Sequence, residues 1–196
     1  MQEPKLAPPG AGIPFIDRVS LRYVLLPLLF SSTSWEQALE RFEKEGQRIL
    51  KIISETPADK LETRKLVAPM QGLEDSSRYW SVAMTVEHLI MVGEQIALGM
   101  KMLADGKVPD RKANTAAVKP KGTIEAAKLY DTFKTFLDKF LNTARNDLKD
   151  RQSKTTYEHP WFGPLTAAQW GVVAAMHQRL HRQQMQNILS QLNVPN

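Results

Sequence analysis

The sequence predicts an all-α protein in which an irregular N-terminal extension precedes a four-helix bundle. Four long segments repeat apolar residues at the helical spacing of three and four, and no alternating strand pattern competes with them. Two of these segments open with a capping-box pattern, and stretches rich in proline and glycine separate them. Four helices with connections of unequal length are most economically arranged as a bundle.

Length and composition limit the class of protein further. A chain of 196 residues with 42% hydrophobic and 24% charged residues suits a single globular domain with one core. We expect the extension at residues 1–33, packed on a bundle at residues 34–196. The absence of cysteine excludes disulfides and thiolate ligands or nucleophiles, so any metal would be bound by His, Asp or Glu.

The extension begins MQEPKLAPPGAGIP, which contains an acid, four prolines and two glycines and does not match a secretory signal. Its apolar run, YVLLPLLF at residues 23–30, is interrupted by Pro27 and is far shorter than the roughly 20 residues that span a bilayer. We expect this run to pack against the core rather than to contact a membrane. We also expect the protein to be cytoplasmic.

The first two helices are expected from about Ser34 to Thr56 and from about Ser77 to Ala104, joined by a long connection after Pro57. Ser34 and Gln37 have the capping-box spacing. The apolar face of the first helix comprises Trp35, Leu39, Phe42, Ile49 and Ile52. One stripe of the second helix comprises Trp80, Met84, His88, Met91, Val92 and Gln95.

A third helix is expected from Thr123, as its N-cap, to Lys149, and a fourth from Thr166 to about Leu192, before Pro195. Gln169 completes a second capping box with Thr166. The expected buried face of the third helix comprises Ala127, Tyr130, Phe133, Leu137 and Phe140.

The net charge of +5 is mostly dispersed along the chain. The densest basic segment, Gly106–Gly122, contains no aromatic residue, and we interpret it as a solvated loop rather than a phosphate-binding one. Because no ordered basic stripe is present, we expect no nucleic-acid partner.

Two histidines of the fourth helix, His177 and His181, are four residues apart and therefore leave one face about one turn apart. Their stripe is apolar, with Trp170, Val173, Ala174, Met185 and Ile188. Two neutral imidazoles there need a polar partner between them, which a divalent ion supplies. His88 could add a third nitrogen and leave a position open for water or substrate, although a lone histidine on an apolar face is more often a hydrogen-bonded core residue.

The segments WSVAMTVEHL (80–89) and HQRLH (177–181) resemble the DinB-like superfamily of four-helix bundles of the DinB and YfiT type. HPWFGPLTAAQW (159–170) is similar to the stretch before the last helix in one branch, a DinB-like domain of unknown function. The resemblance covers most of the chain from about Ser34. It implies a DinB-like four-helix bundle in which His88, His177 and His181 bind a divalent metal ion.

The same resemblance implies an activity, because enzymatic members of the superfamily use the ion to activate a thiol or a water. We therefore expect a metal-dependent transferase or hydrolase with Zn²⁺ or Ni²⁺ and a small-molecule substrate, such as a low-molecular-weight thiol. Its catalytic residues are not identified. The alternative is a non-catalytic bundle with a structural or vestigial metal site that acts through oligomeric or protein–protein contacts, of which a homodimer is the simplest.

Other polar residues have less defined roles. His159 precedes the histidine pair by eighteen residues, about 27 Å along a continuous helix, and is expected to anchor a loop rather than share the ion. Gln95 and Gln184 share the ligand faces and could orient imidazoles, with ordinary surface glutamines as an equal alternative. Glu87 and Glu94 are expected to point away from the histidine stripe, which makes a general-base role speculative.

Overall fold

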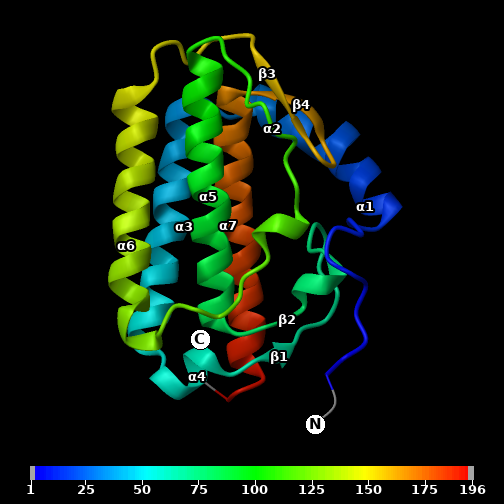
Figure 1. The fold of residues 1–196 in the computed structure, drawn as a ribbon, viewed down its shortest axis with the longest axis vertical. Coiled ribbons are helices and arrows are strands. Elements are labelled where there is room, and N and C mark those ends of the chain that lie inside the picture. Colours follow the sequence, from blue (N-terminus) through cyan, green and yellow to red (C-terminus); the bar gives the residue numbers. More distant parts are fainter. Residues whose placement is uncertain (1–2, 194–196) are drawn as a thin grey trace.

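The computed structural model describes residues 3–193, and four long helices lying side by side form its main body (Figure 1). These helices are α3 (Trp35–Glu55), α5 (Val82–Ala104), α6 (Ala126–Asn142) and α7 (Ala167–Ser190). Helices α3 and α5 each contact both α6 and α7. The predicted all-α class and the four-helix bundle are confirmed.

Both predicted capping boxes are present. The backbone N–H of Gln37 donates to Ser34 Oγ over 3.2 Å, and the backbone N–H of Ser34 donates to Gln37 Oε1 over 2.9 Å. Thr166 and Gln169 exchange the same two bonds at the start of α7. Helix α7 ends at Ser190, slightly before the predicted end, and Pro195 lies outside the described residues.

The aromatic residues of α3 and α6 form the centre of the core. The rings of Phe42 and Phe140 stack with centroids 3.9 Å apart, and Phe136 meets both edge-on. Two residues expected on the buried face of α6, Ala127 and Tyr130, are exposed. The stripe that faces α3 and α5 consists instead of Leu129, Phe133, Phe136, Leu137 and Phe140.

Helix α5 begins later than predicted because other structure occupies the residues before it. A 3₁₀ turn, η2 (Asp75–Ser77), leads into strand β2 (Tyr79–Trp80). Ser81 then caps α5, its hydroxyl accepting from the backbone N–H of Met84 over 3.1 Å.

Helix α6 also begins later, after Glu125, and Thr123 is not its cap as predicted. The hydroxyl of Thr123 donates instead to Glu87 over 2.7 Å. A π-helical turn, η4 (Thr143–Asp147), follows α6 where the sequence predicted a continuous helix.

Two short antiparallel strand pairs lie outside the bundle, and the sequence analysis predicted neither. Strand β1 (Lys65–Leu66) pairs with β2, and β3 (Thr156–His159) pairs with β4 (Gly163–Thr166) directly before α7. Strands of two to four residues are too short to show the alternation that identifies a strand in a sequence. The connections also contain the short helices α4 (Ala58–Glu62) and η3 (Ala116–Val118).

The N-terminal extension is more regular than predicted. Helix α1 (Phe15–Ser20), the π-helical turn η1 (Leu21–Leu25) and helix α2 (Leu26–Ser32) follow one another without a break. The wide turn ends two residues before Pro27, which has no N–H to donate and would crowd an ordinary helical turn. Leu21 and Leu26 are buried. Within residues 3–193, no helix is long and apolar enough to cross a membrane.

Three irregular segments lie together on one side of the bundle, beside α5 and α7 (Figure 1). They are the start of the chain before α1, the connection between α4 and α5, and the loop between α5 and α6. Val118 of the loop between α5 and α6 binds His88, and Ser77 of the connection before α5 binds Gln184 on α7.

Candidate metal centre

The three histidines singled out in the sequence come together in one cluster. His88 lies on α5 and His177 and His181 lie on α7. The Nε2 atom of His177 is 3.2 Å from that of His88 and 3.0 Å from that of His181. His88 and His181 are buried and His177 is partly buried. Trp80 closes one side, its ring parallel to that of His181 at 6.0 Å.

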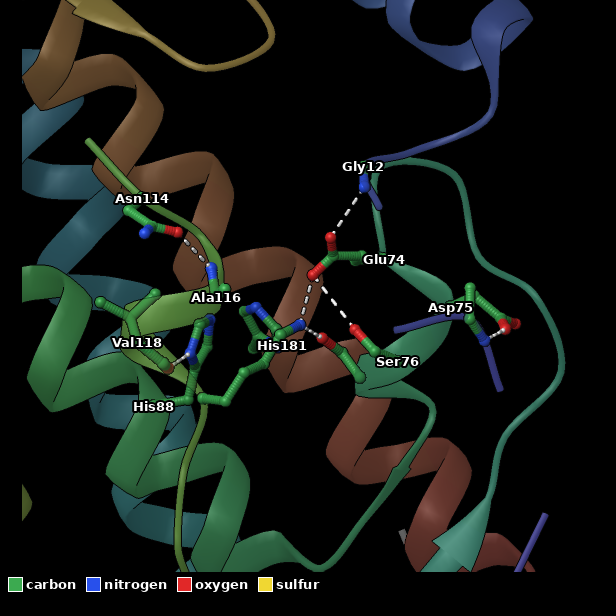
Figure 2. A network of polar contacts seen from close by, with 12 residues as sticks. Gly12, Glu74, Asp75, Ser76, His88, Asn114, Ala116, Val118 and His181 are labelled. Atoms are coloured by element: carbon green, nitrogen blue, oxygen red, sulfur yellow. Dashed lines mark hydrogen bonds and ion pairs between the residues drawn. The ribbon is translucent and has the colours of Figure 1, made fainter. Parts of the chain in front are cut away.

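Hydrogen bonds at Nδ1 determine which nitrogen of His88 and of His181 carries the proton. His88 Nδ1 lies 2.7 Å from the carbonyl oxygen of Val118 (Figure 2). A carbonyl only accepts, so this Nδ1 is protonated and Nε2 of the neutral ring has a free lone pair. His181 Nδ1 lies 2.7 Å from Gln184 Oε1, and the amide nitrogen of Gln184 donates to the Ser77 carbonyl over 2.7 Å. This second bond fixes the orientation of the amide, so His181 has the same tautomer as His88.

The Nε2 atom of His177 therefore faces two nitrogens that only accept. A neutral imidazole carries one proton, so His177 can satisfy one of these neighbours and not both. A cation between the rings is a partner for all three lone pairs. Three bonds of 2.0–2.1 Å at tetrahedral angles separate their nitrogens by about 3.4 Å, close to the spacing in this cluster. The residues thus fit a divalent metal ion.

Burial keeps these imidazoles neutral. Desolvation lowers the pKa of His88 from 6.5 to about 4, against the opposing effect of the bond to Val118. Desolvation, together with repulsion between the rings, also lowers the pKa values of His177 and His181 well below 6.5. At neutral pH all three rings are in the form that binds a metal.

Only three protein side chains make up the cluster. Among residues 3–193, no aspartate, glutamate or fourth histidine joins it. Structural zinc sites are usually closed by four protein ligands, whereas catalytic sites have three and keep one position for water or substrate.

Lys119 is a site residue that the sequence analysis missed, because it lies in the loop interpreted as solvated. Its ammonium group pairs with the buried carboxylate of Glu74, donates to Ser77 Oγ over 2.8 Å and lies 5.5 Å from the ring centre of Trp80. Its charge contributes to the lowered pKa values of His88 and His181, so it lies beside the cluster. The apolar neighbours of Lys119, Val118 and Pro120, were the only local signal of burial in the sequence.

Glu74 connects the cluster to the N-terminal extension. Its carboxylate accepts from the backbone N–H of Gly12 over 2.8 Å and also binds Lys119 (Figure 2). Burial alone would raise the pKa of Glu74, but the bonds from Lys119 and Gly12 and the charge of Lys119 lower it below its ordinary value. The neighbouring Asp75 accepts from the backbone N–H of Ala7 over 2.7 Å.

Of the other polar residues singled out in the sequence, one contacts the histidine cluster and the rest do not. Gln184 orients an imidazole as expected, whereas Gln95 is exposed and outside the cluster. Glu87 is buried, where it accepts from the backbone N–H of Gly122 over 2.6 Å and from Thr123. It anchors the loop before α6 and has no contact that would make it a base. Glu94 is exposed.

His159 anchors a loop, as predicted. Its Nδ1 accepts from the backbone N–H of Trp161 over 3.1 Å, and its ring stacks on Phe162 with centroids 4.2 Å apart. Burial lowers the pKa of His159 to about 3. The distance expected along a continuous helix does not apply, because the β3–β4 hairpin reverses the chain and brings His159 close enough to affect the pKa of His177.

Comparisons with known proteins agree with this architecture. Residues 41–185, which include all three cluster histidines, match the family model of the DinB superfamily. The chain is similar to the crystal structure of TT2238, a four-helix bundle protein, at 25% identity and a TM-score of 0.51, over 78% of this chain and 98% of that one. It is also similar in fold to an uncharacterised protein from Escherichia coli UTI89, at 13% identity and a TM-score of 0.55, over 84% and 97% of the two chains. None of the curated proteins matches this chain.

Proposed function

Because this chain belongs to the DinB superfamily and its three histidines converge, we propose that it is an enzyme with one divalent metal ion bound by His88, His177 and His181. The observation that carries the proposal is the tautomer of His88 and His181, which directs two free lone pairs at a third nitrogen. An all-imidazole set with no thiolate or carboxylate suits Zn²⁺ or Ni²⁺.

The proposed activity is a thiol-dependent transfer or a hydrolysis of a small molecule. When bound, the ion would supply Lewis acidity that lowers the pKa of a water or thiol to near neutrality. Three neutral imidazoles add no negative charge to the site. Lys119 lies beside the cluster with its charge paired to that of Glu74. Val118 and Gln184 hold two of the rings in place.

Metal content tests the binding part of this proposal. Untagged protein purified without chelator is analysed by inductively coupled plasma mass spectrometry, alongside His88→Ala, His177→Ala and His181→Ala. We expect close to one equivalent in the wild type and a loss in each variant. His159→Ala, which removes a histidine outside the cluster, should retain the metal. A wild-type protein that is metal-free and cannot be loaded with Zn²⁺ or Ni²⁺ would contradict the proposal.

The catalytic part needs a separate measurement. Protein loaded with Co²⁺ is titrated with a low-molecular-weight thiol, and the visible and near-ultraviolet absorption is followed. A vacant coordination position predicts a new sulfur-to-metal charge-transfer band. An unchanged spectrum would favour a structural ion and would remove the reason to screen thiol transfer.

The exposed apolar residues of the N-terminal extension favour a second candidate function, self-association. The helices of the extension expose an apolar face in which five large side chains are more than half accessible: Phe15, Ile16, Tyr23, Val24 and Leu28. Exposed apolar patches often mark contact sites. We propose a second copy of this chain as the occupant. If the metal site proves vestigial, this contact is the remaining candidate for the function of the protein.

A further inference from the structure

A cavity of about 430 Å³ lies outside the histidine cluster, within the size range of small-molecule sites. Four segments line this hollow, which is open to solvent: the start of the chain, α1, the loop between α5 and α6, and the β3–β4 turn. Its lining includes Gly12, Arg18, Lys112, Asn114, Pro160 and Trp161.

The side chains around this cavity are suited to an anion. Arg18 and Lys112 supply two positive charges, and no aspartate or glutamate lines the cavity in the described part of the chain. Neither cation forms an ion pair within residues 3–193. The amide oxygen of Asn114 is already bonded to the backbone N–H of Ala116 over 2.9 Å, so its NH₂ group remains as a donor. The indole nitrogen of Trp161 can only donate.

Two of the four segments that line the cavity also reach the metal centre. The loop that carries Asn114 continues to Val118, which binds His88, and Figure 2 shows Asn114, Ala116 and Val118 along one side of His88. Gly12 binds Glu74, the partner of Lys119. Pro160 directly follows His159, whose Nδ1 accepts from the backbone N–H of Trp161, a residue that lines the cavity. The cavity is therefore separate from the cluster, and the segments that line it also carry residues bonded to His88 and Glu74.

We infer that this cavity binds the anionic group, a carboxylate or a phosphate, of the small molecule whose reactive group reaches the metal centre. The role of the bound molecule as substrate rests on the proposed function, whereas the binding of the anion requires no metal. Charge-assisted bonds from Arg18 and Lys112 would supply most of the affinity. The open position at the cluster and the cations at the cavity would then select small molecules with an acid at one end.

Binding of simple anions to metal-free protein tests this inference. Inorganic phosphate and succinate are titrated by isothermal titration calorimetry into the wild type, Arg18→Gln, Lys112→Gln and Arg111→Gln. Arg111 is exposed, lies next to Lys112 in sequence and does not line the cavity, so it is the matched control. We expect saturable binding that is weakened about tenfold or more in each cavity variant and is unchanged in the control. Thermal unfolding of each variant verifies the fold.

The pattern of results separates the two anions and the two proposals. Binding of phosphate alone, or of succinate alone, identifies the acid of the substrate and supports the inference in either case. No saturable binding, or equal loss in the Arg111→Gln control, would overturn it. Loss of binding in His177→Ala would also overturn it, because the anion would then occupy the cluster. Retained anion binding in a protein that cannot be loaded with metal would contradict the proposed function and leave this inference standing.

Discussion

The imidazole of His181 donates through Nδ1 to Gln184 Oε1 over 2.7 Å, and the same amide donates to the carbonyl of Ser77. One glutamine thus fixes the tautomer of His181 and ties α7 to the connection before α5. Removing such an outer partner of a metal-binding histidine typically weakens metal affinity by 10- to 100-fold.

We therefore expect Gln184→Ala to bind Zn²⁺ about 10- to 100-fold more weakly than the wild type, as measured by competition with a chromophoric chelator. Gln183→Ala is the control, because Gln183 is exposed on the same helix and its side chain makes no hydrogen bond within the described residues. Equal affinities of the two variants would show that the amide does not orient the ring.

Acid should destabilise the metal-free protein over a defined range. The pKa of His88 is about 4 in the folded state and about 6.5 when unfolded, so the unfolded chain binds the proton more readily. The free energy of unfolding is then greatest above pH 6.5 and falls as the pH drops toward 4. For His88 alone, the difference corresponds to about 3 kcal/mol.

Urea unfolding at pH 7.5, 5.5 and 4.5 measures this dependence. His88→Gln should make this fall less steep between pH 6.5 and 4, because one titrating histidine is gone while the buried His177 and His181 remain. A free energy of unfolding that stays constant, or rises, as the wild type is acidified from pH 7.5 to 4.5 is incompatible with a neutral buried His88.

Breaking the ion pair of Lys119 and Glu74 should lower the free energy of unfolding. Glu74 is 3% exposed, and removal of its partner would leave a buried carboxylate without a counter-charge. Lys119→Met is expected to lower the free energy of unfolding by about 3 kcal/mol or more, as measured by urea unfolding at pH 7.5. Lys134→Met removes the exposed pair with Asp138 and should change it by less than about 1 kcal/mol. Similar costs for the two variants would mean that the Glu74 charge is accommodated without Lys119.

Alanine substitutions at two glycines of α5 should change the stability of the protein in opposite directions. A Cβ at Gly93 would overlap the ring of Phe136, which Phe42, Phe133 and Phe140 hold in place. Gly93→Ala should therefore destabilise the protein by about 1–3 kcal/mol. A Cβ at Gly99 meets nothing within 4 Å, so Gly99→Ala should stabilise it by up to about 1 kcal/mol through helix propensity. Thermal and urea unfolding check both signs.

The exposed face of the extension predicts a dimer in solution. Ile16 is 78% exposed at one end of this face, and a charge there would oppose its burial against a second copy. Size-exclusion chromatography with light scattering should give twice the chain mass for the wild type and the monomer mass for Ile16→Glu. Glu36→Gln, on the exposed first turn of α3, is the control. A monomeric wild type at micromolar concentration would contradict this prediction.

Local chemistry explains what could be predicted from the sequence. The capping boxes at Ser34 and Thr166 depend on residues three apart, so both helix starts can be predicted from the sequence without knowledge of the fold. The spacing of His177 and His181 places them on one face for the same reason. The third member of the cluster, His88, needed the resemblance to a known superfamily, because nothing local distinguishes it from an ordinary core histidine.

Long-range contacts explain what was missed. Lys119 and Glu74 are 45 residues apart, and only the fold buries the lysine. Strands β1 and β2 pair two residues each, too few to leave a pattern. The late start of α5 follows from this pairing, since Tyr79 and Trp80 belong to the strand rather than to the helix.

The distance along the chain between His88 and His177, 89 residues, also sets the order in which the cluster can assemble during folding. Helix α7 carries its own pair of histidines, but the third joins only when α5 has docked against it. An ion that needs all three ligands can therefore stabilise the docked bundle and cannot stabilise the separate helices that precede it. Such an ion would act mainly by slowing unfolding, with little effect on the rate of folding.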